Sequence, residues 1–263
     1  MSAEWIYGRQ VARLALAPGA LRRPTRLAVT PAALAALGSG ALPGGLVPEL
    51  TDAYELERLT GSRDHQGVAL MVPAYPYAAS ADLLAGDLVI ALDEVSDPHN
   101  LGAVARTALT CGAGGLVIPR HRSATVTPAA VKASAGATEH LAVAEVTNLT
   151  AFLREAQKAG FWVYGAAGEG PDSYLNLDLK VKVVLVFGSE GRGLRRLVAE
   201  TCDQLAALPM SGPVESLNVS VAAAVFLYEA RRQRDAAAAG TERTGSPEPS
   251  RASARSNAGK KPL

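Results

Sequence analysis

The sequence has few cysteines and few aromatic residues, and its opposite charges nearly cancel. Two cysteines, Cys111 and Cys202, cannot make a disulfide framework, and both lie in apolar segments, so a reduced cytoplasmic protein is expected. A net charge of +1 excludes a global basic field, so local patches must bind any nucleic-acid partner. No apolar run reaches the roughly 18 residues of a membrane helix, and charges interrupt the start MSAEWIYGRQ, so neither a membrane span nor a signal peptide is expected.

Two common nucleotide-binding signatures are also missing. The chain has no G-K-[ST], which excludes a P-loop. Its glycine phrase at Gly188, GSEGRG, lacks the G-x-G-x-x-G spacing and comes late in its domain. The other glycine phrase, GAGG at 112–115, is explained by a helix end and a tight turn. No His/Cys cluster has the spacing of a zinc site, so no metal is expected.

A hydrophobic content of 48% is enough for one or two domains with real cores. In the second half of the chain, apolar strands are expected at 87–92, 115–118, 141–145, 161–165, 182–187 and 205–208. Helical patterns alternate with them at about 100–111, 128–135, 149–159, 193–201 and 218–233. This alternation predicts an α/β fold with a mostly parallel sheet. The runs LVIAL and VVLVF are apolar throughout, which is typical of strands buried on both faces.

A smaller α/β unit is expected before this sheet, with helices at 5–17, 31–37 and 50–59 and strands at 26–30 and after GSRDHQG. Two prolines near residues 73–85 indicate an interdomain linker. We therefore expect a small domain at 1–73, a linker at 74–85 and a larger domain at 86–234. The remaining 235–263 lacks apolar periodicity and is expected to be a disordered basic tail, either solvated or in weak contact with RNA.

Three segments carry polar side chains in a pattern that suggests a site. The segment DPHNLGAVARTALTCG at 97–112 places Asn100 as a helix N-cap and Arg106 in the second turn. The segment FGSEGRGL puts Glu190 directly after a buried strand, and a third segment puts Ser216 and Asn218 before an apolar helix. Each alone is explained by a cap, a turn or a solvated charge. Together they indicate a ligand site at glycine-rich loops, where a ligand can approach the backbone.

NLGAVAR, FGSEGRGL and LPMSGPVESLNVSVAAAVFLYEA resemble the three motifs of the SpoU (TrmH-like) ribose 2′-O-methyltransferases of the SPOUT superfamily, in order over roughly residues 88–233. WIYGRQVARLAL and GSRDHQGVAL resemble the small RNA-binding domain of the bacterial subfamily that methylates a guanosine in 23S ribosomal RNA. The resemblance implies S-adenosylmethionine as cofactor, a homodimer, and a carboxyl-terminal trefoil knot with its loops at 188–193 and 208–218. A knot is a rare exception among folds.

The resemblance also implies residue roles. Its catalytic set is Asn100, Arg106, Glu190, Ser216 and Asn218, and its cofactor set is Gly188, Leu208, Met210, Leu217 and Asn218. The missing side chain of Gly188 would let the adenosyl group approach the main chain. Arg106 is either a general base or a cation that holds the target phosphate and stabilises the forming alkoxide. Guanidinium groups stay protonated in proteins, which favours the second role.

Phosphate contacts require local cations, and the RRPTR run at 22–26 is the strongest candidate patch. The full set of RNA-binding candidates is Arg9, Arg13, Arg22, Arg23 and Arg26 in the small domain, with Arg120 and Arg122 beside the larger sheet. Other interpretations remain open. The same reaction could act on transfer RNA or on a resistance-type ribosomal site, or the chain could be a non-catalytic RNA-binding assembly factor, against which its complete polar set speaks.

Overall fold

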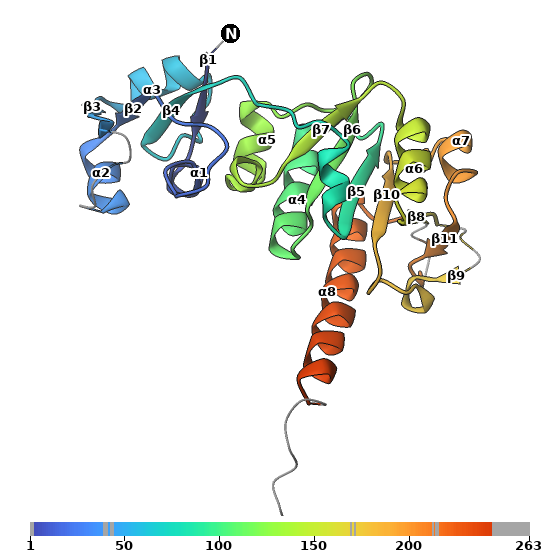
Figure 1. The fold of residues 1–263 in the computed structure, drawn as a ribbon. Coiled ribbons are helices and arrows are strands. Elements are labelled where there is room, and N and C mark those ends of the chain that lie inside the picture. The colour runs from blue at the N-terminus through green and yellow to red at the C-terminus, as the bar shows by residue number, and fades with distance from the viewer. Residues whose placement is uncertain are drawn as a thin grey trace, which may run out of the picture.

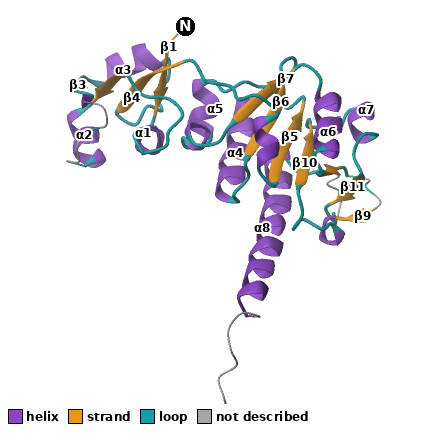
Figure 2. Cartoon of the chain, viewed as in Figure 1, coloured by secondary structure: helices purple, strands orange, loops and turns teal. Residues whose placement is uncertain are grey.

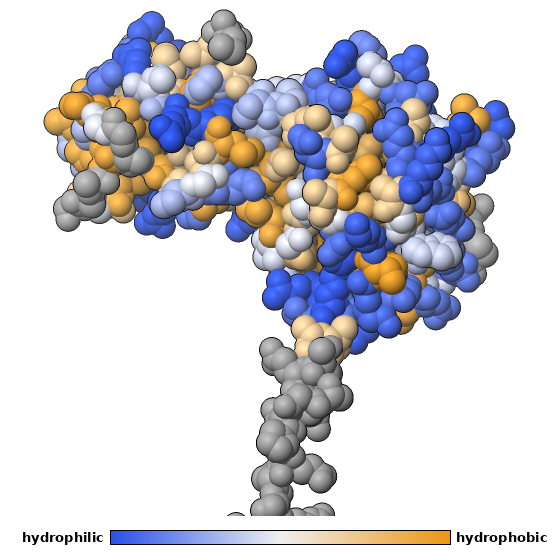
Figure 3. Space-filling model, viewed as in Figure 1, coloured by the Kyte–Doolittle hydropathy of each residue, from blue (hydrophilic) through white to orange (hydrophobic). Residues whose placement is uncertain are grey.

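The computed structural model has two α/β domains joined by an extended segment, and a long carboxyl-terminal helix projects from the larger domain (Figure 1, Figure 2). The structure describes residues 3–38, 42, 45–168, 170, 172–211, 213 and 216–243. The two domains touch along one side, and an open concave side lies between the small domain and the projecting helix (Figure 3).

The small domain is a sheet with strands in the order β1-β4-β2-β3. Its strands are β1 (Ala3–Tyr7), β2 (Arg26–Val29), β3 (Pro48–Leu50) and β4 (Val68–Pro73). Its helices are α1 (Arg9–Ala15), α2 (Pro31–Leu37) and α3 (Ala53–Thr60). The expected helix pattern at 31–37 is confirmed, as are the strands at 26–30 and after GSRDHQG.

Two helices predicted for this domain begin too early. Residues 5–7 belong to β1 because that segment pairs antiparallel with β4, and Gly8, at φ +110°, then turns the chain into α1. Residues 48–50 pair with β2, and the following helix α3 begins only after Asp52, whose side chain accepts a hydrogen bond from Glu55 N at 2.8 Å. In both places pairing with a distant strand overrides the local helical pattern.

The larger domain contains a parallel sheet with strands in the order β7-β6-β5-β10-β8-β11-β9. These strands are β5 (Leu88–Asp93), β6 (Gly115–Pro119), β7 (Val143–Val146), β8 (Trp162–Ala166), β9 (Asp172–Ser173), β10 (Val183–Gly188) and β11 (Gln204–Ala207). The predicted mostly parallel α/β fold is therefore confirmed; only the two-residue β9 has no counterpart among the predicted strands.

Helices cover both faces of this sheet, namely α4 (Pro98–Thr110), α5 (Pro128–Ala133), α6 (Leu149–Lys158), α7 (Arg196–Ala199) and α8 (Val219–Arg243). Short 3₁₀ turns lie at Asp82–Ala85, Ala137–Glu139 and Tyr174–Asn176. Alternate residues of β5 enter different cores: Ile90 packs in the cluster of α4, α5 and α8, and Val89 packs in that of α6 and α7. Burial on both faces explains why LVIAL and VVLVF are apolar at every position.

Helix α8 continues beyond the residue where the tail was expected to begin. The expectation of a disordered segment from 235 is wrong for 235–243, which are helical. The alanines that follow Asp235 are strong helix formers, and Arg231 pairs with Asp235 one turn along. The rest of the predicted tail, 244–263, lies outside the described residues.

The connection at 74–85 is packed against the larger domain. The Tyr75 hydroxyl donates to Leu141 O at 2.6 Å, and Ala78 N donates to Val143 O at 2.9 Å. The Tyr77 hydroxyl accepts from Val126 N at 3.0 Å. These hydrogen bonds fix residues 74–85, which we call the strap, to the larger domain. The expected linker would instead have left the two domains only tethered to each other.

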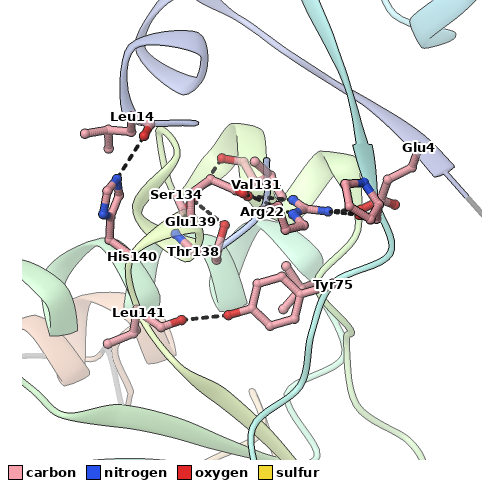
Figure 4. A network of polar contacts seen from close by, with 12 residues as sticks. Glu4, Leu14, Arg22, Tyr75, Val131, Ser134, Thr138, Glu139, His140 and Leu141 are labelled. Atoms are coloured by element: carbon pink, nitrogen blue, oxygen red, sulfur yellow. Dashed lines mark hydrogen bonds and ion pairs between the residues drawn. The ribbon is translucent and has the colours of Figure 1, made fainter. Parts of the chain in front are cut away.

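A buried ion cluster joins the two domains (Figure 4). Arg22, 2% exposed, donates from Nε to Glu139 Oε2 at 3.0 Å, and its other nitrogens bond Glu139 and Glu4. Glu139 belongs to the larger domain and its side chain is fully buried. The expectation that Arg22 contacts RNA is wrong for this structure, because two carboxylates occupy the guanidinium and no phosphate can reach it. Next to the cluster, His140 Nε2 lies 2.9 Å from Leu14 O.

Both cysteines are free thiols. Burial raises the pKa of Cys202 to about 12, with Asp203 and Asp93 adding to the shift. Burial also raises the pKa of Cys111 above its ordinary value. Because a thiol must ionise to act as a nucleophile, neither cysteine is placed for covalent chemistry at neutral pH.

Replacing Arg22 with methionine should destabilise the protein strongly. The change leaves the Glu139 carboxylate buried without its cation, a loss that typically costs ~3–5 kcal/mol. Urea unfolding of Arg22→Met and Arg26→Met makes the comparison, since Arg26 forms a solvent-exposed pair with Glu49. Equal stabilities of the two variants would contradict a structural role for the buried cluster.

Candidate active site

The carboxyl ends of several strands meet along one edge of the large sheet. Gly188 at the end of β10 lies beside Asp93 at the end of β5, and on its other side Phe187 lies beside Ala166 of β8. Ala206 of β11 pairs with Ala166 in turn. The segments that leave these strands therefore start side by side, which is where ligands bind in open parallel sheets.

Three polar side chains from distant segments form a closed set at this edge. Asn100 Nδ2 donates to Glu190 Oε1 at 3.0 Å, and Asn218 Nδ2 donates to Asn100 Oδ1 at 3.0 Å. Asn218 Nδ2 also donates to Glu190 Oε1. We call Asn100, Glu190 and Asn218 the amide–carboxylate ring. The structure thus brings together one residue from each of the three motifs.

Helix α4 is capped by a different residue from the one predicted, whereas α8 is capped by one of the two expected candidates, Asn218. Asp97, and not Asn100, caps α4 by accepting from His99 N at 2.9 Å, with Pro98 in the first helical position. The side chain of Asn100 is therefore free to join the ring, where the residue is only 7% exposed. At α8, Asn218 Oδ1 accepts from Ser220 N at 2.9 Å, so the residue that caps this helix also donates to the ring.

The loop after β10 is closed by its own backbone. Ser189 and Gly193 exchange hydrogen bonds of 3.1 and 2.9 Å, and Gly191 and Gly193 have φ angles of +78° and +65°. A Cβ on Gly188 would lie 2.1 Å from the carbonyl carbon of Gly193. Close return of the loop is thus sufficient to require glycine at 188, a reason different from the expected approach of an adenosyl group.

A buried carboxylate holds the end of this loop and was not singled out from the sequence. Asp93, fully buried at the end of β5, accepts from Arg195 N at 2.8 Å and from Arg195 Nε at 2.7 Å. The Arg195 guanidinium also lies 3.3 Å from Glu94. The available signal was two carboxylates directly after the LVIAL strand and two arginines directly after the glycine loop. This ion pair fixes where the loop can lie over the strand ends.

Two predicted catalytic residues do not join the ring. Arg106 lies on α4 six residues beyond Asn100, about 9 Å along the helix axis, and is exposed. Ser216 is exposed just before α8. Within the described segments, no hydrogen-bond or ion-pair partner contacts the Arg106 guanidinium or the Ser216 hydroxyl. The structure therefore leaves both polar groups available to a bound molecule.

The predicted cofactor residues follow the strand ends. Leu208 comes directly after β11 and is half-buried, while Met210 and Leu217 are 37% and 41% exposed. Asn218 belongs to the ring, and Gly188 ends β10. Exposed apolar side chains beside main chain at strand ends suit a ligand that is partly apolar and partly hydrogen-bonding.

A separate cavity of about 680 Å³ lies next to the Asp93–Arg195 pair. Its lining includes Glu94, His121, Arg122, Asn148 and Arg195. No member of the amide–carboxylate ring and no predicted cofactor residue lines it. The cavity therefore differs from the place where the three motifs meet, and we do not assign the cofactor to it.

The remaining candidates for RNA contact are exposed arginines. Arg23 and Arg120 are exposed. Arg26 is paired with Glu49 and lies over the Trp5 ring, 5.2 Å from its centroid. The exposed Arg9 bonds Gln66, as described below. In the part of the chain that the structure describes, no group of three or more His, Cys, Asp or Glu side chains is placed to hold a metal ion.

None of the described helices is long and apolar enough to cross a membrane.

Known proteins are similar to this chain in both sequence and fold. The SpoU rRNA Methylase family model matches residues 87–228, more than half of the chain. An uncharacterized tRNA/rRNA methyltransferase of Mycobacterium ulcerans is 47% identical over 186 residues, which are 68% of this chain and 60% of that protein. The chain thus spans about 60% of the length of such curated relatives.

Two solved structures extend the likeness to three dimensions. The AdoMet-bound rRNA methyltransferase from Sinorhizobium meliloti has a TM-score of 0.70 at 29% identity and covers 88% of this chain and 87% of its own. A structure concerned with 2-OH methylation of C/U34 on tRNA has a TM-score of 0.51 at 32% identity, covering 57% of this chain and 97% of its own. The fold and the three motifs are those of the SpoU- and TrmH-type methyltransferases. The chain belongs to the SpoU rRNA Methylase family.

Breaking two sides of the ring should give non-additive losses of stability. Glu190→Ala leaves the buried Asn100 amide without its acceptor, at a typical cost of ~1–3 kcal/mol, whereas Asn100→Ala removes hydrogen bonds to two exposed partners, each worth about 0.5–1.5 kcal/mol. Because both residues belong to one network, the double variant should lose less than the sum, with a coupling of ~0.5–3 kcal/mol. Denaturant unfolding of the two single variants and the double variant measures this coupling, and strict additivity would contradict the ring.

Gly188→Ala should be clearly less stable than a substitution elsewhere in the same loop. The added methyl group would overlap the Gly193 carbonyl, and overpacking of this kind costs ~1–3 kcal/mol. Gly191→Asn is the matched control, because no atom lies within 4 Å of its Cβ position and asparagine tolerates the left-handed conformation. Thermal unfolding compares the two, and an unperturbed Gly188→Ala would contradict the close return of the loop.

Proposed function

We propose that this protein transfers a methyl group from S-adenosylmethionine to a ribose 2′-hydroxyl of RNA. The observation that carries this proposal is the amide–carboxylate ring, which joins all three SpoU motifs at the carboxyl edge of the sheet. The Sinorhizobium meliloti neighbour binds AdoMet, and the tRNA structure concerns methylation of a 2-OH group. Both likenesses support the same chemistry for this chain.

The residues that follow β10 and β11 fit the cofactor. Main chain at Gly188 and Leu208 would bind its polar groups, and the exposed side chains of Met210 and Leu217 would cover its apolar parts. Asn218 would help to hold the loop against the cofactor through its bond to Glu190. When bound, S-adenosylmethionine supplies a methyl group on a positively charged sulfonium, which an oxygen nucleophile can attack directly.

Arg106 is proposed to bind the target phosphate and stabilise the charge that develops on the ribose oxygen. Its guanidinium is exposed and has no carboxylate partner among the described residues, so its charge is available to RNA. Electrostatic stabilisation of a forming oxyanion fits a permanently charged group better than proton abstraction does. Ser216, exposed beside Asn218, is proposed to bind the same nucleotide by its hydroxyl.

The path of the chain is consistent with the expected trefoil knot, which we propose for residues 188–218. From β11, two strands away from β10, the chain returns across the sheet edge to α8. Helix α8 packs on α4 and β10, with Phe226 edge-on to Phe187 at 5.6 Å. A return of this kind past the glycine loop is compatible with threading.

A second copy of the chain is proposed to cover α8. Val221 and Tyr228, 49% and 57% exposed, lie seven residues apart and therefore on one side of the helix. Sedimentation of the full chain at enzyme concentrations tests this, and a purely monomeric mass would contradict it.

The RNA is proposed to be 23S ribosomal RNA, methylated on a guanosine. The YGRQ and DHQG segments of the small domain favour this substrate by their resemblance to the ribosomal subfamily. Transfer RNA is the second candidate, because the tRNA structure shares 32% of its sequence with this chain. A resistance-type ribosomal site is the third.

Methyl transfer to purified ribosomal and transfer RNA, followed by mapping of the ribose-methylated nucleotide, tests the proposed function. Incorporation into 23S RNA at one guanosine is the expected result. Calorimetry with S-adenosylmethionine separates the alternative of a non-catalytic assembly factor, since such a scaffold need not bind it. Cofactor binding without transfer to any RNA would reject the proposed reaction.

Arg106→Lys should lower the turnover by roughly 10²–10³-fold, the usual loss when one donor to a developing oxyanion is removed. Lysine loses a proton more readily than arginine does. If the residue were a general base, activity of the variant would therefore rise with pH. The role proposed here predicts low activity that stays flat across pH, measured as methyl incorporation between pH 7 and roughly pH 10, just below the ordinary lysine pKa.

A further inference from the structure

The two sequence segments typical of the small domain meet a lysine of the larger domain. Arg9 N donates to Gln66 Oε1 at 3.0 Å, and Arg9 Nε donates to Gln66 O at 3.2 Å. From α5, Lys132 Nζ donates to Asp64 O at 2.8 Å. The turn before α1, the DHQG loop and α5 therefore come together at the boundary between the domains. We call Arg9, Gln66 and Lys132 the boundary cluster.

The backbone at this boundary is shaped around the lysine. Gly8 has a φ of +110°, and a Cβ there would lie 2.7 Å from Lys132 Nζ and 3.4 Å from Gln66 Oε1. Gln66 itself has a φ of +54°, a left-handed backbone conformation that residues other than glycine rarely adopt. Strained positions of this kind often occur at ligand-binding sites. The ammonium group also lies 5.7 Å from the centre of the Tyr7 ring.

The charges of the boundary cluster are not neutralised by ion pairs. In the described ranges, neither Arg9 nor Lys132 forms an ion pair with a carboxylate. Arg26 and Arg58, which belong to the small domain like Arg9, each form one. Burial lowers the pKa of Lys132, and the Asp64 carboxylate acts in the opposite direction. Arg9 and Gln66 are exposed and Lys132 is half-buried, so a solvent-borne anion can reach the cluster.

Contacts across the domain boundary fix the position of Arg9 relative to Lys132. Arg22 and Glu139 form their buried pair across the same boundary, and Leu21 N donates to Glu139 O at 2.7 Å. The strap adds the Tyr75–Leu141 hydrogen bond. An anion that binds Arg9 and Lys132 together would meet a site that needs no domain movement to form.

We propose that the boundary cluster binds a phosphodiester of the substrate RNA, with one cation from each domain. The Arg9 guanidinium and the Lys132 ammonium supply the charge, and the Gln66 amide supplies a neutral hydrogen bond. The proposal rests on the proposed function and deepens it, because it places an RNA contact on the domain boundary in addition to the small domain and the catalytic edge.

The salt dependence of RNA binding tests this contact. Wild type, Arg9→Gln and Lys132→Gln are titrated with purified 23S ribosomal RNA over a range of salt concentrations. Each variant should lower the slope of log K against log salt by about 0.7–1, and should weaken binding roughly fivefold at ~0.1 M salt. Lys158→Gln is the control, because Lys158 is an exposed cation at the end of α6, on the helix that covers the other face of the sheet.

A second variant separates charge from packing. Lys132→Arg keeps the cation and should have the wild-type slope. If Lys132 were purely structural, Lys132→Gln would lose affinity while its slope stayed unchanged. An unchanged slope in Arg9→Gln and Lys132→Gln, or an equal change in Lys158→Gln, overturns the boundary contact. Failure of the wild type to bind or methylate any RNA would instead count against the proposed function, and calorimetry with S-adenosylmethionine reports cofactor binding independently.

Discussion

The carboxylate of Glu190 accepts hydrogen bonds from two amides that lie on different helices. Asn100 of α4 is 90 residues from Glu190 and 118 residues from Asn218, and the ring is where these segments are held together. Asp93, at the end of β5, reinforces this arrangement by binding Arg195 at the end of the same loop. Two carboxylates thus hold the loop: Glu190 within the loop and Asp93 at the end of the neighbouring strand. The exposed Ser216 and Leu217 lie directly before the ring residue Asn218.

Local pattern was sufficient for most of the larger domain. Strands buried on both faces are apolar at every position, so β5 and β10 could be predicted from LVIAL and VVLVF within one residue. The three polar segments could be grouped because their order and residue types match a known family. Neither source could show that Asn100 would leave the capping position to Asp97. That exchange depends on a partner ninety residues away, Glu190, to which the amide donates.

Three of the other errors share one physical cause, which is contact between residues distant in sequence. Residues 5–7 have a helical pattern, but pairing with β4 makes them a strand. Arg22 sits in a basic run that suggests an RNA patch, yet its partner Glu139 is 117 residues away and buried. Two prolines suggest a loose linker at 74–85, but Tyr75 and Tyr77 anchor it. Each outcome required knowledge of which surfaces the fold brings together.

For the RNA contacts proposed above, the buried Arg22–Glu139 pair has a consequence for how the substrate is selected. An RNA-binding domain on a flexible linker can reorient to fit many RNAs. A domain that buried contacts fix to its neighbour instead keeps the RNA-binding surfaces of the two domains at a set width. Any mismatch between that width and the RNA must then be absorbed by bending or unstacking the nucleic acid. Selectivity would come in part from how readily each RNA deforms, a form of indirect readout at nucleotides that no side chain touches.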